Sequence, residues 1–109
     1  MVLMVVTSYF PIDKASEAAK SYIKSLQKYP PDASLAKTLT IGVRATKDGY
    51  KVIGIGDVVK GKYEEALLRQ IQSAQEFNAG IEGYRYKIET FMDITEAMPI
   101  VGVEAPEDR

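Results

Sequence analysis

The sequence contains no cysteine, no histidine and no tryptophan among its 109 residues. Without cysteine the chain cannot form a disulfide, a thiolate zinc site, an iron–sulfur cluster or a thiol catalyst. Without histidine it lacks the usual general base at neutral pH, the usual haem ligand and the commonest zinc ligand. These absences exclude whole classes of enzyme, and we predict neither a metal site nor a cofactor.

The chain has little net charge, and that charge is unevenly placed. Its formal net charge is -1, yet residues 93–109 hold five of the 15 acidic residues and one of the 14 basic residues. The remainder therefore has 13 basic and 10 acidic residues, an excess too small to indicate nucleic-acid binding. An RRM-type sheet would also need aromatic residues where we expect Val52, Gly54 and Gly56. We predict no nucleic-acid partner.

Long apolar runs are missing too. The first ten residues, MVLMVVTSYF, are apolar, but they lack the basic region and the cleavage site of a signal peptide. No run approaches the roughly 18 to 20 apolar residues that span a bilayer. The sequence predicts a cytoplasmic protein without a membrane partner.

The hydrophobic pattern predicts strands and helices in the order β-α-β-β-α-β. Strands are expected at 2–9, 35–46, 50–59 and 81–91, and helices at 14–28 and 63–78. Asp13 is the expected N-cap of the first helix, and Asp48-Gly49 suits a tight hairpin turn. This order predicts an α+β, ferredoxin-like domain over residues 1–93, with an antiparallel sheet and two helices on one face. Residues 94–109 form a tail, with one helical turn that Pro99 ends, docking on its own or a neighbouring subunit.

We expect the two faces of the sheet to differ. Ile53 and Ile55 are predicted to face the helices, so the second face receives Val52, Gly54, Gly56 and Val58. The first strand is apolar on both sides, and the glycines would thin the sheet where a second sheet packs close. A second subunit is the economical cover, which predicts a homodimer or a higher homo-oligomer. The first helix should turn a stripe toward the sheet that comprises Ala15, Ala18, Ala19, Tyr22, Ile23 and Leu26.

Three stretches carry a resemblance to known proteins: KDGYKVIGIGDVVKGKYEEAL, IEGYRYKIE and TEAMPIVG. With the element order and length, they resemble the dimeric α+β barrel superfamily, and one uncharacterised group of small proteins within it. The resemblance implies that two ferredoxin-like subunits place their sheets face to face. That superfamily includes cofactor-free monooxygenases, isomerases, haem proteins and amino-acid-sensing domains. The haem branch and the histidine- and tryptophan-dependent monooxygenase sites have no counterpart here.

Candidate binding residues are mainly tyrosines. The glycines of GIGDVVKG do not match a dinucleotide fingerprint, because Val59 stands where the third glycine belongs. A ligand site between helices and sheet would use Tyr9, Tyr22, Tyr63, Tyr84 and Tyr86, whose rings and hydroxyls can line a small pocket. The same tyrosines could instead be simple core residues. Arg44 and Arg85 are expected on one face, holding an anion or pairing with Glu89.

The sequence therefore favours a small homo-oligomeric protein that binds a small molecule between its helices and sheet. The alternative is a cofactor-independent enzyme, monooxygenase-like or isomerase-like, that uses Tyr84, Tyr86, Tyr9 or Asp57. A third possibility is a component of a larger complex, contacted through the tail. An enclosed polar pocket with a carboxylate or tyrosine of shifted pKa would favour the enzyme.

Overall fold

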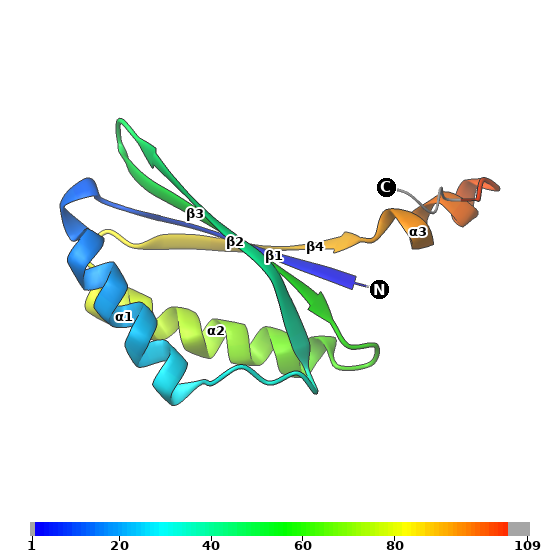
Figure 1. Ribbon diagram of the computed structural model, residues 1–109, viewed down its shortest axis with the longest axis horizontal. Coiled ribbons are helices and arrows are strands. Elements are labelled where there is room, and N and C mark those ends of the chain that lie inside the picture. Colours follow the sequence, from blue (N-terminus) through cyan, green and yellow to red (C-terminus); the bar gives the residue numbers. More distant parts are fainter. Residues whose placement is uncertain (1, 105–109) are drawn as a thin grey trace.

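The computed structural model describes residues 2–104. Its elements are β1 (Val2–Phe10), η1 (Ile12–Lys14), α1 (Ala15–Lys28), β2 (Ala36–Thr46), β3 (Gly49–Val58), α2 (Tyr63–Gly80), β4 (Arg85–Met92), α3 (Ile94–Ala97) and η2 (Met98–Val101). The strands form one antiparallel sheet in the order β2-β3-β1-β4. Figure 1 shows α1 and α2 on one face of this sheet. The predicted ferredoxin-like α+β fold is confirmed.

The boundaries differ most before β4. The expected strand at 81–91 begins only at Arg85, because a turn precedes it. Gly83 has a φ of 83°, a left-handed conformation that favours glycine, and the Tyr84 N–H donates to the Ile81 carbonyl over 3.3 Å. Ile81 is 1% exposed and anchors the end of α2 in the core. Helix α2 also extends to Gly80, two residues beyond the predicted end.

One prediction about helix ends was wrong. Asp13 lies inside the short η1 turn, and Lys14 occupies the N-cap of α1 without a side-chain capping bond. The helical turn predicted in the tail is present as α3, which ends at Ala97, and Pro99 stands in the first turn of η2, where a missing N–H costs nothing. Asp93 instead caps α3 by accepting from the Thr95 N–H at 3.1 Å.

Strand register decides which side chains face the helices. Val6 lies opposite both Gly54 and Ile88, whereas its neighbour Val5 lies opposite Ile55 and Glu89. Directly opposed residues share a face of a sheet, and Val6 and Ile88 pack on the core with Met4. The helix side of β3 therefore carries Val52, Gly54, Gly56 and Val58, and the open side carries Lys51, Ile53, Ile55 and Asp57.

The predicted face assignment of β3 was thus inverted. Both faces of this strand are apolar, so alternation alone could not identify the core side. The glycines thin the sheet beneath the helices, and they do not make room for a second sheet. An added Cβ at Gly54 would meet only Ile41 Cγ1, at 4.0 Å, and one at Gly56 only the Lys37 carbonyl oxygen, at 3.8 Å.

The buried core is small and lies where α2 crosses the sheet. Met4 and Val58 meet Ala66 of α2 there, and the partly buried Leu67 and Ile88 complete the contact. The remaining chain spreads outward. Its radius of gyration is 15.7 Å, against about 13 Å for a compact domain near this size. Figure 1 shows the cause: the tip of the β2–β3 hairpin and the segment after β4 both project from the body.

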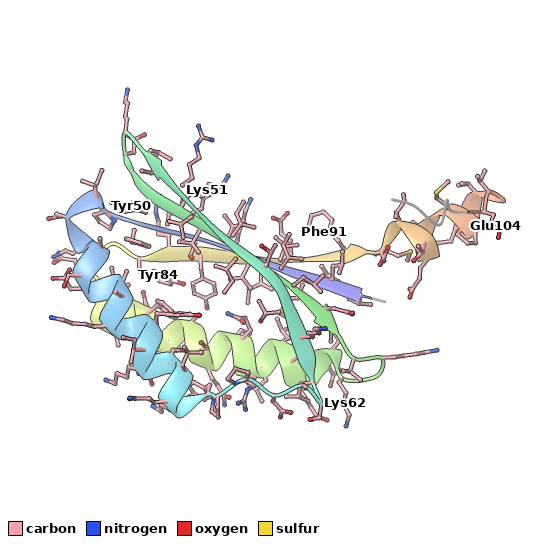
Figure 2. All side chains as sticks on the ribbon, in the orientation of Figure 1. Tyr50, Lys51, Lys62, Tyr84, Phe91 and Glu104 are labelled. Carbon is pink, nitrogen blue, oxygen red and sulfur yellow. The ribbon has the colours of Figure 1, made fainter. Side chains whose placement is uncertain are left out.

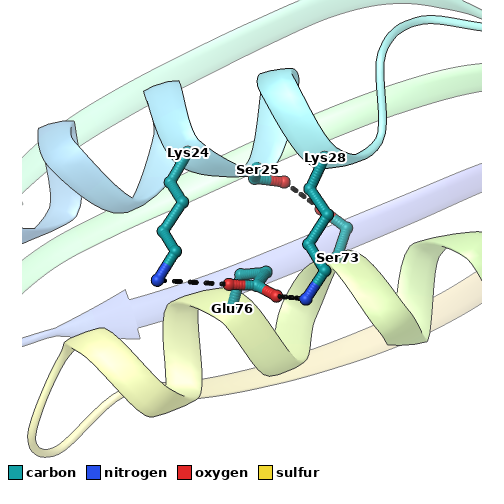
Figure 3. A network of polar contacts seen from close by, with 5 residues as sticks. All are labelled: Lys24, Ser25, Lys28, Ser73 and Glu76. Carbon is teal, nitrogen blue, oxygen red and sulfur yellow. Dashed lines mark hydrogen bonds and ion pairs between the residues drawn. The ribbon is translucent and has the colours of Figure 1, made fainter.

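Helix α1 packs on α2 through small polar residues. Ser25 Oγ lies 2.5 Å from Ser73 Oγ (Figure 3), and a Cβ at Gly80 would lie only 2.5 Å from Ser21 Oγ. The predicted apolar stripe is rotated partly away from this contact, because Tyr22 is 46% exposed and Ile23 57% exposed. The prediction that this stripe is buried on the sheet was therefore wrong for its large residues.

An ion pair joins the ends of the same two helices. The Lys28 ammonium donates to Glu76 Oε1 over 2.5 Å, and Lys24 lies 3.9 Å from Glu76 Oε2 (Figure 3). The hydrogen bond from Lys28 lowers the pKa of the Glu76 carboxyl, and the same bond raises the pKa of Lys28. The pair holds α1 against α2 at neutral pH.

Candidate functional site: tyrosines on both sides of the sheet

On the helix side, an aromatic cluster forms around Tyr84. Its ring stacks on Phe77 of α2, with 5.5 Å between centroids, and lies 5.9 Å from the ring of Tyr86. Burial raises the pKa of the Tyr84 hydroxyl, although a hydrogen bond with Ser8 opposes the shift. At neutral pH this group is therefore an un-ionised phenol, able to donate one hydrogen bond and to accept another.

The other helix-side tyrosines lie apart from this cluster. Tyr63 begins α2, and its hydroxyl hydrogen-bonds the Thr90 hydroxyl. Thr90 is four residues along β4 from Tyr86, or about 13 Å at ~3.3 Å per residue. Tyr22 is half-exposed on α1. Sequence reasoning placed Tyr63, Tyr84 and Tyr86 on the correct side of the sheet, but only Tyr84 and Tyr86 meet.

Tyr9 faces the opposite side of the sheet. It lies directly opposite Lys51 on one neighbouring strand and Arg85 on the other, while Arg44 lies opposite Lys51. Arg44, Lys51, Tyr9 and Arg85 therefore form one line across the whole sheet, which we call the basic row. The cationic groups of Lys51 and Arg85 each lie 6.0 Å from the centre of the Tyr9 ring. The five predicted tyrosines thus do not form a single pocket.

An open hollow of about 280 Å³ lies beside the basic row, lined by Tyr9, Arg85, Tyr86 and Lys87. Lys87 pairs with Glu89 at 3.5 Å. The prediction that Arg44 and Arg85 share a face is confirmed. Sequence reasoning missed Lys51, because the inverted face of β3 placed it toward the helices. Alternation in β3, combined with a correct register to β1, would have found it.

Beyond the basic row, the open side carries apolar residues interspersed with Thr7, Lys87, Glu89 and Asp57. Leu3 and Val5 of β1, Ile53 and Ile55 of β3, and Phe91 of β4 occupy successive positions there. We call these five residues the apolar centre. Phe91 is 48% exposed, and Figure 2 shows it on the side of the sheet away from the helices, with Tyr84 on the helix side. Within residues 2–104 no helix covers this surface.

Asp57, a candidate base, lies far from Tyr84. It sits at the end of the open side opposite the basic row, in a second open hollow of about 290 Å³ lined by Lys37, Asp57, Val58, Val59 and Lys60. Asp57 and Tyr84 therefore cannot act on one small substrate within a subunit. Among residues 2–104, no three acidic side chains gather where they could hold a metal ion. The helices described there are too short or too polar to cross a membrane.

Comparisons with known proteins identify the fold. No protein-family model matches the chain, and the comparison with curated proteins finds no match. A dimeric ferredoxin-like protein from an uncultured marine organism matches with a TM-score of 0.52 and 10% identity, covering 85% of this chain and 94% of that one. SnoaB, a cofactor-independent oxygenase from Streptomyces nogalater, matches with a TM-score of 0.51 and 10% identity, covering 84% and 92%.

A third match is the de novo designed protein Foldit4, with a TM-score of 0.52, 11% identity and coverage of 84% of this chain and 96% of that chain. These likenesses show the fold alone. They confirm the ferredoxin-like fold that the resemblance to the dimeric α+β barrel superfamily implied.

Proposed function

We propose that this chain acts as a homodimer whose subunits pack open side to open side, and that each subunit binds a small molecule beside Tyr84. The observation that carries the dimer is the apolar centre, which lies uncovered at the middle of the open side within the described chain. Exposed apolar surface of this kind favours burial against a self-complementary surface. The marine ferredoxin-like protein of the same fold is described as dimeric, which supports a dimer here.

The small core supports the same proposal. Six hydrophobic residues of the described chain are buried, and three of them are alanines. A domain of this length buries a smaller share of its surface than a larger one does, so joining two sheets would add apolar contact that one subunit lacks. We place the dimer in the cytoplasm, following the sequence prediction.

The ligand proposal rests on the Tyr84 cluster. Phe77 and Tyr86 pack their rings against Tyr84 and make its surroundings aromatic, and the neutral Tyr84 hydroxyl and Ser8 provide hydrogen-bonding groups. This chemistry fits a small, planar, largely apolar molecule with one or two polar groups. Tyr9 is outside this site because it lies on the opposite side of the sheet.

The dimer is tested by light scattering coupled to size-exclusion chromatography. The wild-type chain is expected at twice its 12.1 kDa mass. Ile55→Lys would place a charge in the apolar centre and should give a folded monomer. The matched control is Val43→Lys, because Val43 is 65% exposed on the helix side of edge strand β2. A monomeric wild type at micromolar concentration would overturn the proposal.

The ligand site is tested by native mass spectrometry and thermal shift with a library of small aromatic compounds. Compounds that raise the melting temperature of the wild type should lose this effect in Tyr84→Phe, which keeps the ring but removes the hydroxyl. Tyr22→Phe is the control, because Tyr22 is exposed on α1. Equal shifts in all three proteins would exclude Tyr84 from the site.

A cofactor-independent enzyme is the second candidate. Two observations favour it: Tyr84 is a half-buried phenol of raised pKa, and SnoaB, described as a cofactor-independent oxygenase, has the same fold. The hollows beside Tyr9 and Asp57 are open to solvent, so they are not the enclosed polar pocket that the enzyme hypothesis requires. Oxygen uptake with a panel of phenolic substrates, in wild type and Tyr84→Phe, tests it. If no substrate is turned over, or if Tyr84→Phe turns substrates over as fast as the wild type, the enzyme proposal is wrong and ligand binding is the function that stands.

A further inference from the structure

The segment that follows β4 carries exposed apolar residues and negative charge. We call residues 94–104 the C-terminal arm; it contains α3, η2 and the described end of the chain. Ile100 is 72% exposed and Val101 is 76% exposed. Figure 1 shows the arm projecting beyond the end of β4, away from α1 and α2. Exposed apolar side chains gathered in this way indicate a segment that packs against another surface.

The arm is poorly placed to reach the basic row of its own subunit. Strand β4 begins at Arg85, within the basic row, and ends at Met92, just before the arm. Seven residue steps at ~3.3 Å each separate the two ends by about 23 Å. The arm then leads farther from the row. Contact within one subunit would require the arm to reverse its direction.

Charge selects between two ways of packing the open sides together. A two-fold axis parallel to the strands would stack one basic row on the other, which places like charges in contact. An axis across the strands, in the plane between the sheets, reverses the partner. Each basic row then lies over the far end of the other sheet, near the point where the partner's arm begins.

We propose, building on the face-to-face dimer, that the C-terminal arm of one subunit docks on the basic row of the other. The complementarity has two parts. Arg44, Lys51 and Arg85 give the row its positive charge, whereas the arm holds two acidic residues, Glu96 and Glu104, and no basic residue. Ile100 and Val101 supply apolar surface to cover the Tyr9 ring, which lies in the middle of the row.

Disulfide trapping tests this docking. Because the chain has no native cysteine, only the introduced cysteines can form a disulfide. A Lys51→Cys chain is mixed with a tagged Glu104→Cys chain under mild oxidation. The expected result is a disulfide between the two different chains. Lys20→Cys replaces Lys51→Cys in the control mixture, because Lys20 is exposed on α1, away from the basic row. The control should give little cross-linked product.

Charge reversal tests the electrostatic part. Arg44→Glu combined with Arg85→Glu should abolish the trapped product, and high salt should reduce it, while circular dichroism confirms that the variant folds. Trapping that is indifferent to both changes would overturn docking on the basic row. In a chain carrying both cysteines, trapping within one chain would show that the arm docks on its own subunit, which also overturns the proposal.

The same samples separate this proposal from the one on which it rests. If light scattering shows a dimer but trapping does not exceed the Lys20→Cys control, the docking is wrong and the face-to-face dimer stands. If light scattering shows a monomer, the dimer itself is wrong.

Discussion

Both sides of the sheet carry apolar residues, but only the helix side forms the core of the subunit. The helix side carries Met4, Val58 and two glycines, and α2 closes over it to make the core of one subunit. The open side carries the apolar centre with the basic row at one end, and within residues 2–104 no helix covers it. Neighbouring residues of one strand thus have different roles. Met4 stabilises the fold of the subunit, whereas Val5 belongs to the surface proposed for dimerisation.

The largest expected effect comes from breaking the helix side at Met4, which is 6% exposed. Met4→Ala should lower the free energy of unfolding by about 2–5 kcal/mol, because a buried side chain is replaced by a cavity. At low protein concentration, Val5→Ala should lower the free energy of unfolding by less than Met4→Ala does. Its main effect should be a weaker association of the subunits. Urea unfolding followed by circular dichroism at two protein concentrations measures both. A larger loss for Val5→Ala in the monomer would contradict the comparison.

Glycines on the helix side provide the next contrast. Gly54 has ordinary space for a Cβ, so Gly54→Ala should raise stability by about 0.4–1 kcal/mol through a less flexible unfolded chain, without changing association. Gly49→Ala is the opposing control: its φ of 141° is strained for alanine, and the new Cβ would collide with the Phe10 carbonyl oxygen. Gly49→Ala should lower the free energy of unfolding by more than Gly54→Ala raises it. If Gly54→Ala no longer forms a dimer, Gly54 lies at the subunit interface and the assignment to the helix side is wrong.

Alkaline pH provides a smaller test of the helix side. Because burial raises the pKa of Tyr84 above its ordinary value of 10.0, the unfolded chain loses this proton first as pH rises. Stability should therefore fall with rising pH between the ordinary and the raised values. Phenolate absorbance should show one late-titrating tyrosine that disappears in Tyr84→Phe. An unchanged titration curve in that variant would place the hydroxyl in solvent.

The smallest effect is expected at the contact between α1 and α2. Lys28 lowers the pKa of Glu76 from its ordinary value of 4.5, so the pair contributes stability above that value and loses it as pH falls through the lowered one. Glu76→Gln should lower the melting temperature slightly at neutral pH and remove this part of the acid dependence. Glu64→Gln, an exposed change on the same helix, is the control. Identical acid profiles for wild type and Glu76→Gln would show that the pair contributes nothing.

Much of the candidate site could be predicted, but its grouping could not. Tyr84 and Tyr86 were assigned to the helix side because alternation in a mixed strand separates Tyr86 and Ile88 from Arg85 and Lys87. Tyr9 was grouped with them because both faces of β1 are apolar and nothing local distinguishes them. The basic row was missed for a related reason: Arg44, Lys51, Tyr9 and Arg85 come from four strands and meet only through register.

The sequence by itself determined the order of strands and helices, the Asp48-Gly49 hairpin and the exclusion of thiol and histidine chemistry, because these depend on local periodicity and residue type. Only the tertiary structure decided which face of β3 lies under the helices. That choice depends on pairing with β1, since Ile53 and Ile55 are as apolar as the residues that alternate with them. Pairing with β1 and β4 also puts Tyr9 and Tyr84 on opposite sides of one sheet.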